Sequence, residues 1–261
     1  MPHIGLFIPC YIEQFYPQVG VATYELLKTL GYQISFPLHQ TCCGQPLANS
    51  GYACESKKSV TQLLSRFEAY DYVVGPSASC VYHIRQHTAS LLKDHKPLKN
   101  TAQKFLDLTE FIFSQNRQND IQGFFDGRIA LHKSCHGLRR LKLGKCSELM
   151  GKEENQQAVL LQQIEGIEIV TPQRADECCG FGGTFAVTQE VLSTRMGMDR
   201  LQDYLNAGAE ILTSGDMSCL MHLDGLIKRN HLPLKTMHLA EILYQAVQQK
   251  QSSVKSSAYV Q

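Results

Sequence analysis

The sequence lacks both an excess of charge of either sign and any long apolar run. Its 25 lysines and arginines stand against 24 acidic residues, giving a formal net charge of +1. This balance gives no reason to expect a nucleic acid or an anionic membrane as the main partner. No apolar run approaches the roughly 18 residues of a membrane-spanning helix, and the apolar start, Ile4 to Pro9, is too short for a secretory signal. We therefore expect a cytoplasmic protein with no membrane span.

Cysteine, by contrast, is abundant, with ten in 261 residues. Structural disulfides rarely persist in the cytoplasm, so these cysteines need another explanation. A metal site, a redox role and simple burial are the three alternatives. The chain is also 43% hydrophobic, which is enough for the core of one large domain or two smaller ones.

Eight of the ten cysteines repeat in the same order in the two halves of the chain. Each half holds a single cysteine, a Cys-Cys-Gly tripeptide and another single cysteine: Cys10, Cys42-Cys43-Gly44 and Cys80, then Cys135, Cys178-Cys179-Gly180 and Cys219. The flanking residues match too, as in Ser79-Cys80-Val81-Tyr82-His83 and Ser218-Cys219-Leu220-Met221-His222. The pattern predicts an internal duplication, with a first domain over 1–123, a second over 124–250 and a flexible tail over 251–261.

Short β-rich runs alternate with helical patterns in both halves. The expected strands are Ile4–Pro9, Gln33–Pro37 and Tyr72–Val74, with Arg128–His132, Ile167–Thr171 and Glu210–Thr213 as their counterparts. Strands that alternate with helices indicate parallel sheets. We therefore predict an α/β fold of two similar halves, each a parallel sheet flanked by helices, related by a pseudo-twofold internal repeat.

The repeated cysteines all follow predicted strands. Because the carboxyl ends of parallel strands meet at one edge of a sheet, each half should bring its four thiols together. Four thiolates suit tetrahedral zinc or an iron–sulfur cluster. A nucleophilic cysteine enzyme would need one activated thiol rather than two sets of four. Cys54 and Cys146 have no repeat partner, and we expect them to be ordinary buried residues.

Histidines accompany the cysteines. His83 and His222 follow Cys80 and Cys219 by three residues, so on a helix each shares a face with its cysteine. Each is a candidate metal ligand, a hydrogen-bond donor to the site or a packed residue. His132 and His136 flank Cys135 without counterparts in the first half, and we expect them to be incidental.

These paired motifs resemble the duplicated CCG (cysteine-rich) domain family. That family includes the cysteine-rich subunit of heterodisulfide reductase, the glycolate oxidase iron–sulfur subunit and lactate utilisation protein A. Within the family, Cys178-Cys179-Gly180-Phe181-Gly182-Gly183-Thr184-Phe185 and Ser218-Cys219-Leu220-Met221-His222 look most like the lactate utilisation group. The resemblance covers residues 3 to about 245.

The resemblance implies an iron–sulfur electron-transfer subunit of a cytoplasmic oxidoreductase complex that converts L-lactate to pyruvate. It implies one or two 4Fe–4S clusters on the eight repeated cysteines, with zinc in one half as a variant. The implied partners are a ferredoxin-type iron–sulfur subunit and a third lactate-utilisation subunit. No catalytic residue is assigned.

The sequence departs from the heterodisulfide reductase pattern at one position in each half. That pattern ends in Cys-x-x-Cys, whereas His83 and His222 stand at the last position here. The departure argues against a five-cysteine noncubane cluster. Two alternative functions stay open: a catalytic subunit that reduces disulfides or heterodisulfides, and a zinc-stabilised scaffold without a redox role.

Overall fold

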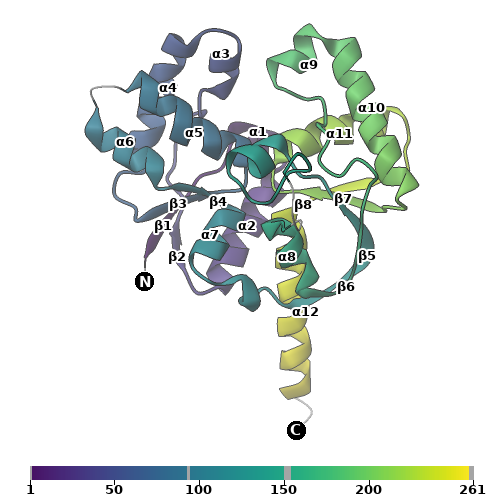
Figure 1. The fold of residues 1–261 in the computed structure, drawn as a ribbon. Helices are drawn as coiled ribbons and strands as arrows, with labels where there is room; N and C mark the ends of the chain where they lie inside the picture. Colours follow the sequence, from purple (N-terminus) through teal and green to yellow (C-terminus); the bar gives the residue numbers. More distant parts are fainter. Residues whose placement is uncertain (1, 93–94, 150–153, 259–261) are drawn as a thin grey trace.

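The computed structural model describes residues 2–92, 95–149 and 154–258, and these form two four-stranded parallel sheets (Figure 1). In the first sheet the strands run in the order β2 (Gln33–Ser35), β1 (His3–Leu6), β3 (Tyr72–Gly75) and β4 (Phe105–Asp107). In the second sheet the order is β6 (Ile164–Val170), β5 (Gly123–Leu131), β7 (Ile211–Ser214) and β8 (Lys235–His238). All strand pairs are parallel, and the two orders are equivalent. The predicted fold class of two similar α/β halves is confirmed.

Helices connect the strands. The first half contains α1 (Cys10–Phe15), α2 (Pro17–Thr29), α3 (Gln45–Asn49), α4 (Ala53–Ser65), α5 (Ala78–Leu91), α6 (Lys96–Gln103), α7 (Leu108–Ser114) and the short 3-10 helix η1 (Gln118–Asp120). The second half contains the π-helix η2 (His136–Arg140), α8 (Gln156–Gln162), α9 (Thr184–Thr188), α10 (Glu190–Asn206), α11 (Met217–Arg229) and α12 (Leu239–Ala258). Helix α12 thus continues into the expected tail, whose residues 259–261 lie outside the described residues.

Side chains of β1 and of the residues after it alternate between two cores. Ile4, Leu6 and Ile8 belong to one large cluster that also contains Ile129 and Leu212 of the second half. Phe7 points the other way, into a smaller cluster beneath α4, α5 and α6. This period-two alternation is that of a strand covered on both faces. The two halves therefore share one core, and the boundary near residue 123 stays a prediction.

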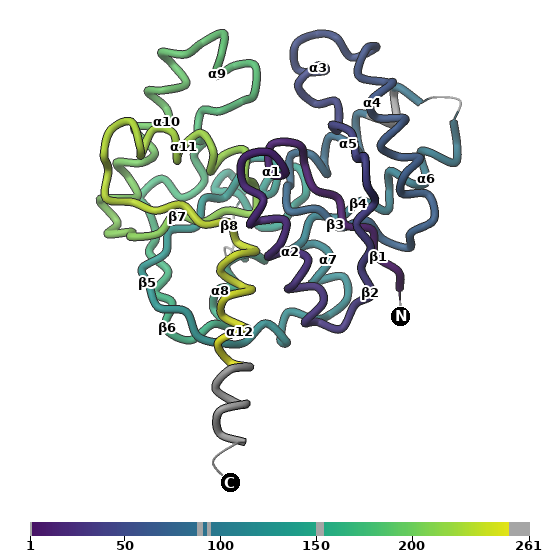
Figure 2. The backbone as a smooth tube through the Cα atoms, turned by 180° about the vertical axis from the view of Figure 1, so that it is seen from behind, coloured from purple at the N-terminus to yellow at the C-terminus, as the bar shows by residue number. Residues whose placement is uncertain are grey.

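The contact between the halves has the symmetry of the repeat. Helix α2 packs on α12, and the equivalent pair, α8 and α7, packs in the same way with the halves exchanged. Figure 2 shows α2 and α12 side by side from behind. At the centre, Ser77 and Asp216 form an antiparallel bridge, and each lies three residues before the last cysteine of its set. This exchange of equivalent elements is what a pseudo-twofold axis produces.

Two strands were not predicted from the sequence. β4 and β8 are only three and four residues long, and each is followed directly by a helix. The capping residues Asp107 and His238 end them: Asp107 accepts a hydrogen bond from the Thr109 N–H, and His238 Nδ1 accepts one from the Ala240 N–H. No helix in the described part of the chain is long and apolar enough to cross a membrane.

Candidate metal centres

The first candidate site lies where three strands of the first sheet end. Cys10 opens α1 just after β1, and Cys80 lies in the first turn of α5 after β3. Cys42 and Cys43 occupy the loop between β2 and α3. Thiol–thiol hydrogen bonds join them in the sequence Cys10–Cys42–Cys43–Cys80. The structure thus brings the four predicted residues into one continuous group.

The second candidate site repeats this arrangement. Cys135 directly precedes η2, Cys178 and Cys179 lie in the loop before α9, and Cys219 lies in the first turn of α11. Their thiols are joined in the same order, Cys135–Cys178–Cys179–Cys219. All ten cysteines lie in the described ranges and are free thiols. The role of the eight repeated thiols as metal ligands stays a prediction.

One thiol in each site is set up to lose its proton first. Hydrogen bonds from Cys10 and Cys43 lower the pKa of Cys42 to about 2, and those from Cys135 and Cys179 lower the pKa of Cys178 to about 2. The backbone N–H of the following glycine, Gly44 or Gly180, lies 3.4 Å from the same sulfur atom. The thiolate is the form that binds metals. Each group therefore contains one stabilised thiolate with three neighbouring thiols whose protons a cation would displace.

The glycine of each Cys-Cys-Gly tripeptide is required by the backbone. Gly44 has φ +83° and Gly180 has φ +86°, in the left-handed region that side chains disfavour. A Cβ atom on Gly180 would also lie 2.7 Å from the backbone oxygen of Ser193. The turn that follows each cysteine pair therefore requires glycine.

His83 and His222 lie beside their sites, as the spacing suggested. His83 is 2% exposed, and burial lowers its pKa to about 4, so it is neutral near pH 7. The nearby Cys42 thiolate acts in the opposite direction on His83, and Cys178 does the same on His222. Among the described residues, Nε2 of each ring has no hydrogen-bond partner. Whether either ring binds metal stays a prediction.

The structure places His132 and His136 beside the second thiol group, although we expected them to be incidental. Whether they act there stays a prediction. A ring nitrogen of His132 and the Sγ atoms of Cys179 and Cys219 all lie within 4.8 Å of one another. His136 Nδ1 lies 3.7 Å from Cys135 Sγ. The missed signal is positional: aligned on Cys10 and Cys135, the halves place a histidine in the second where the first has Phe7.

The two unrepeated cysteines are also not core residues. Cys54 is exposed in the first turn of α4, and Cys146 is partly exposed in a loop next to Glu148. The expectation of burial failed because it rested on cysteine's general preference for the interior and not on a local pattern. Both lie outside the two thiol groups.

Asp216 joins the two sites through hydrogen bonds. Its fully buried carboxylate accepts hydrogen bonds from the Ser218 N–H and hydroxyl at the start of α11. It also accepts hydrogen bonds from the Ser79 N–H, at 2.8 Å, and the Ser79 hydroxyl, at 3.1 Å, at the start of α5. One carboxylate therefore caps both cysteine-bearing helices, where a negative charge is favoured.

The donor set fits a soft or borderline metal. Each site offers four sulfur ligands, backbone N–H groups aimed at sulfur, and a buried imidazole Nε2 left without a partner in the described structure. Thiolates select zinc or iron–sulfur clusters over magnesium or calcium. A cleft of about 650 Å³ reaches the second site, with Cys135 and Cys178 in its wall.

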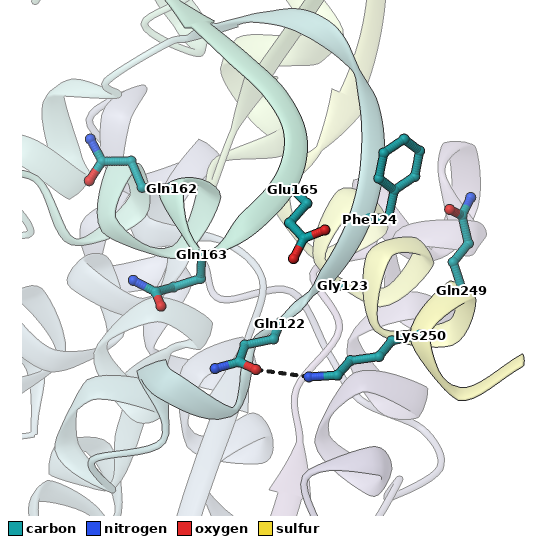
Figure 3. A pocket seen from close by; sticks show the side chains of 8 residues that line it. All are labelled: Gln122, Gly123, Phe124, Gln162, Gln163, Glu165, Gln249 and Lys250. Atoms are coloured by element: carbon teal, nitrogen blue, oxygen red, sulfur yellow. Dashed lines mark hydrogen bonds between the residues drawn. The ribbon is translucent and has the colours of Figure 1, made fainter. Parts of the chain in front are cut away.

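A second hollow, of about 640 Å³, lies at the other end of the second sheet, where β5 and β6 begin (Figure 3). Half of its lining residues are glutamines, and the Lys250 ammonium donates a hydrogen bond to the Gln122 side-chain oxygen across it. No cysteine or histidine is among its lining residues. We assign it no function.

Comparison with known proteins agrees with the repeat. The model of the CCG cysteine-rich domain matches residues 4–85 and 129–224. Lactate utilization protein A of an Exiguobacterium species is 37% identical over 95% of this chain and 100% of its own length. Lactate utilization protein A of a Geobacillus species is 38% identical over 92% of this chain and 98% of its own length.

The fold also occurs among solved structures. A hypothetical protein from Helicobacter pylori superposes with a TM-score of 0.63 at 13% identity, over 94% of this chain and 49% of that chain. This chain thus spans about half of that protein, and the likeness concerns the fold alone. Given the two domain matches and the relatives along its whole length, the chain belongs to the CCG cysteine-rich domain family that includes lactate utilization protein A.

Proposed function

We propose that this chain is the iron–sulfur electron-transfer subunit of a cytoplasmic complex that oxidises L-lactate to pyruvate. The observation that carries the proposal is the pair of four-thiol groups at equivalent sheet edges, each with one stabilised thiolate. The names of the relatives support lactate as the substrate of the complex.

The ligands would be the eight repeated cysteines: Cys10, Cys42, Cys43 and Cys80 in the first half, and Cys135, Cys178, Cys179 and Cys219 in the second. A 4Fe–4S cluster held there would accept and return single electrons. Cys10 and Cys178 are exposed, whereas Cys43, Cys80, Cys179 and Cys219 are buried. Each site therefore reaches the surface along one side, which suits electron exchange with a docked partner.

The partners in this proposal are a ferredoxin-type iron–sulfur subunit and a third lactate-utilisation subunit. No flavin or nicotinamide fingerprint was found in the sequence, so the carbon chemistry would occur in another subunit or at an interface with one. The chain's own residues would bind the clusters, limit their contact with solvent and orient them toward the partners.

A catalytic reductase is the second candidate, and the cleft beside Cys135 and Cys178 is the observation that favours it. A small disulfide could approach the second site through this opening. The third candidate is a zinc-stabilised scaffold, which the compact group of His132, Cys179 and Cys219 favours, since histidine and cysteine are typical zinc-binding residue types.

Electron paramagnetic resonance separates the three functions. The protein is purified without oxygen, reduced with dithionite and then mixed either with its oxidised ferredoxin-type partner or with a small disulfide. Electron transfer predicts a cluster signal that the partner abolishes and the disulfide leaves intact. Loss of the signal with the disulfide alone would favour the reductase, and absence of any signal from protein rich in zinc would favour the scaffold.

A further inference from the structure

The two sites differ in the aromatic pair that lies behind them. In the first half, the rings of Phe7 and Phe67 meet edge to face, with centroids 6.3 Å apart and planes at 89°. In the second half, His132 and Tyr204 meet with centroids 6.3 Å apart and planes at 88°. The N–H groups of Phe7 and His132 donate to equivalent residues of the neighbouring strand, Val74 and Thr213. The same packing motif is therefore apolar behind the first site and polar behind the second.

A third replacement accompanies the pair. Four residues before Phe67 stands Leu63, whereas four residues before Tyr204 stands Arg200, and both are 0% exposed. Arg200 Nε donates a hydrogen bond to the Tyr204 hydroxyl at 3.0 Å, and Arg200 also pairs with Asp203 at 2.7 Å. Burying a guanidinium is costly unless it is paired and hydrogen-bonded, so this arrangement holds Arg200 in a fixed position.

The hydrogen bonds select one tautomer of His132. A guanidinium can only donate, so the Tyr204 oxygen accepts from Arg200. The Tyr204 oxygen lies 2.7 Å from His132 Nδ1, and the phenol proton has no other acceptor among the described residues. In the arrangement that gives every one of these donors an acceptor, the Tyr204 hydroxyl therefore donates to His132 Nδ1. The proton of the neutral imidazole ring is then on Nε2. His132 is 1% exposed, and its Nε2 has no hydrogen-bond partner in the described structure, although a His132 ring nitrogen lies within 4.8 Å of the Cys179 and Cys219 sulfurs.

We propose that His132 is a positioning residue that donates an Nε2–H hydrogen bond to the cluster-binding sulfur of Cys179 or Cys219, and that Arg200 and Tyr204 fix it in this role. A hydrogen bond to a ligand sulfur withdraws electron density and favours the reduced, more negative cluster. Phe7 offers the first site no donor at the equivalent position. The hydrogen bond from His132 therefore makes the second cluster easier to reduce than it would be without His132, a conclusion that rests on the proposed electron-transfer function.

The tautomer can be tested without any cluster. Long-range proton–nitrogen correlation spectra of the reduced, metal-free protein labelled with ¹⁵N-histidine report which ring nitrogen carries the proton. His132, assigned by comparison with H132Q, should show protonated Nε2 and unprotonated Nδ1. A proton on Nδ1 would overturn the proposal, because Nε2 would then be free to bind metal directly.

The effect on the cluster is tested with two matched variants. In H132Q the amide nitrogen lies near the position of His Nε2, whereas in H132N it lies near that of Nδ1. In redox titrations followed by paramagnetic resonance, H132N should shift the midpoint potential of the second cluster downward. H132Q should stay near wild type, and the first cluster should not move in either variant. Equal potentials for both variants and wild type would overturn the proposal.

A third variant copies the first half. R200L/H132F/Y204F supplies the residues that stand at the equivalent positions of the first half, and it should lower the midpoint potential of the second cluster as H132N does. Iron and acid-labile sulfide are measured on the same samples. Zinc without sulfide in the wild type would refute the proposed function while leaving the tautomer result valid, whereas intact clusters with unshifted potentials would refute the hydrogen bond alone.

Discussion

The first and second sites share their donors and differ in their surroundings. Both use a Cys-Cys-Gly turn whose glycine has a left-handed backbone conformation, and in both the four thiols are linked by hydrogen bonds in the same order. Behind the thiols, the first half packs Phe7 and Leu63, whereas the second half packs His132 and Arg200. The duplication has thus kept the geometry that gathers sulfur and changed the polarity around it. Residues beyond the ligands tune a metal centre, so equal ligand sets need not give equal chemistry.

The same asymmetry exists on the pseudo-twofold axis. Ser77 and Asp216 occupy equivalent positions, but only Asp216 has a side chain that caps helices in both halves. The second half therefore supplies a group on which the first half depends. Two copies with a shared core and a shared cap are expected to unfold together rather than one at a time.

The largest effect should come from removing one thiolate in each site in turn. Cys42→Ser and Cys178→Ser each delete the thiol with the lowered pKa, and each should lose the metal of its own half, which is about half of the total iron if both halves hold equal clusters. Metal analysis of anaerobically purified protein measures this. Cys54→Ser, an exposed cysteine outside both groups, is the control and should retain all iron. Unchanged iron content in either site variant would show that the substituted cysteine's half holds no cluster.

Asp216 and Ser77 should differ in their contribution to stability. Asp216→Ala removes four hydrogen bonds, two at the start of α5 and two at the start of α11, so we expect a loss of about 3 kcal/mol. Ser77→Ala removes the contact with the Tyr11 hydroxyl and two longer hydrogen bonds, with the Ser79 hydroxyl and the Cys80 N–H, and should cost about 1 kcal/mol. Urea unfolding followed by circular dichroism compares them. Equal losses would contradict the view that Asp216 serves both halves.

The two glycine turns provide a smaller contrast. Gly180→Ala places a Cβ 2.7 Å from the Ser193 backbone oxygen, whereas at Gly44 the nearest atoms are side-chain carbons of Ser56 and Val60 at 3.0 Å. Both substitutions place a side chain on a residue with positive φ, which strains the backbone, but only Gly180→Ala also forces a backbone shift. We therefore expect the free energy of unfolding to fall by about 1 kcal/mol for Gly44→Ala and by about 2 kcal/mol or more for Gly180→Ala. The same unfolding assay measures this difference, and a reversed order would show that the Gly44 turn is the less adaptable one.

The smallest contrast is in the pH dependence of stability. Burial, followed by the Glu110 charge, raises the pKa of Asp107 to about 8 from 3.8, so the folded state keeps a proton that the unfolded chain has lost. Stability from this group falls as pH rises from about 4 to 8. At the equivalent position, burial lowers the pKa of His238 to about 4 from 6.5, so stability falls as pH drops through that window.

Asn substitutions test the two opposite slopes. Asp107→Asn keeps an acceptor for the Thr109 N–H and should make the protein more stable at pH 8 by roughly 1 kcal/mol or more. His238→Asn keeps an acceptor for the Ala240 N–H and should flatten the curve between pH 4 and 6.5. Thermal unfolding at several pH values is the measurement. Curves parallel to wild type would show that these groups do not titrate as their burial implies.

The fold could be predicted from the sequence because the patterns that indicate its strands and helices are local and occur in both halves of the chain. Six strands and the gathering of thiols could be predicted from alternation, strand ends and the repeated tripeptides. β4 and β8 could not, because each short strand continues directly into a helix, so that no loop separates the strand pattern from the helical one. The proposed role of His132 could not be predicted, because its partners, Arg200 and Tyr204, lie about 70 residues away in the sequence and meet it only in the folded core. Comparing the halves position by position would have exposed the change from Phe7.

The most direct test of the central claim is the content of iron, acid-labile sulfide and zinc per chain after strictly anaerobic purification. If both four-thiol groups hold iron–sulfur clusters, iron and sulfide are present in equal amounts, zinc is far below one per chain, and Cys42→Ser and Cys178→Ser each lower iron and sulfide together. Stoichiometric zinc without sulfide, unaffected by aerobic or anaerobic handling, would contradict it.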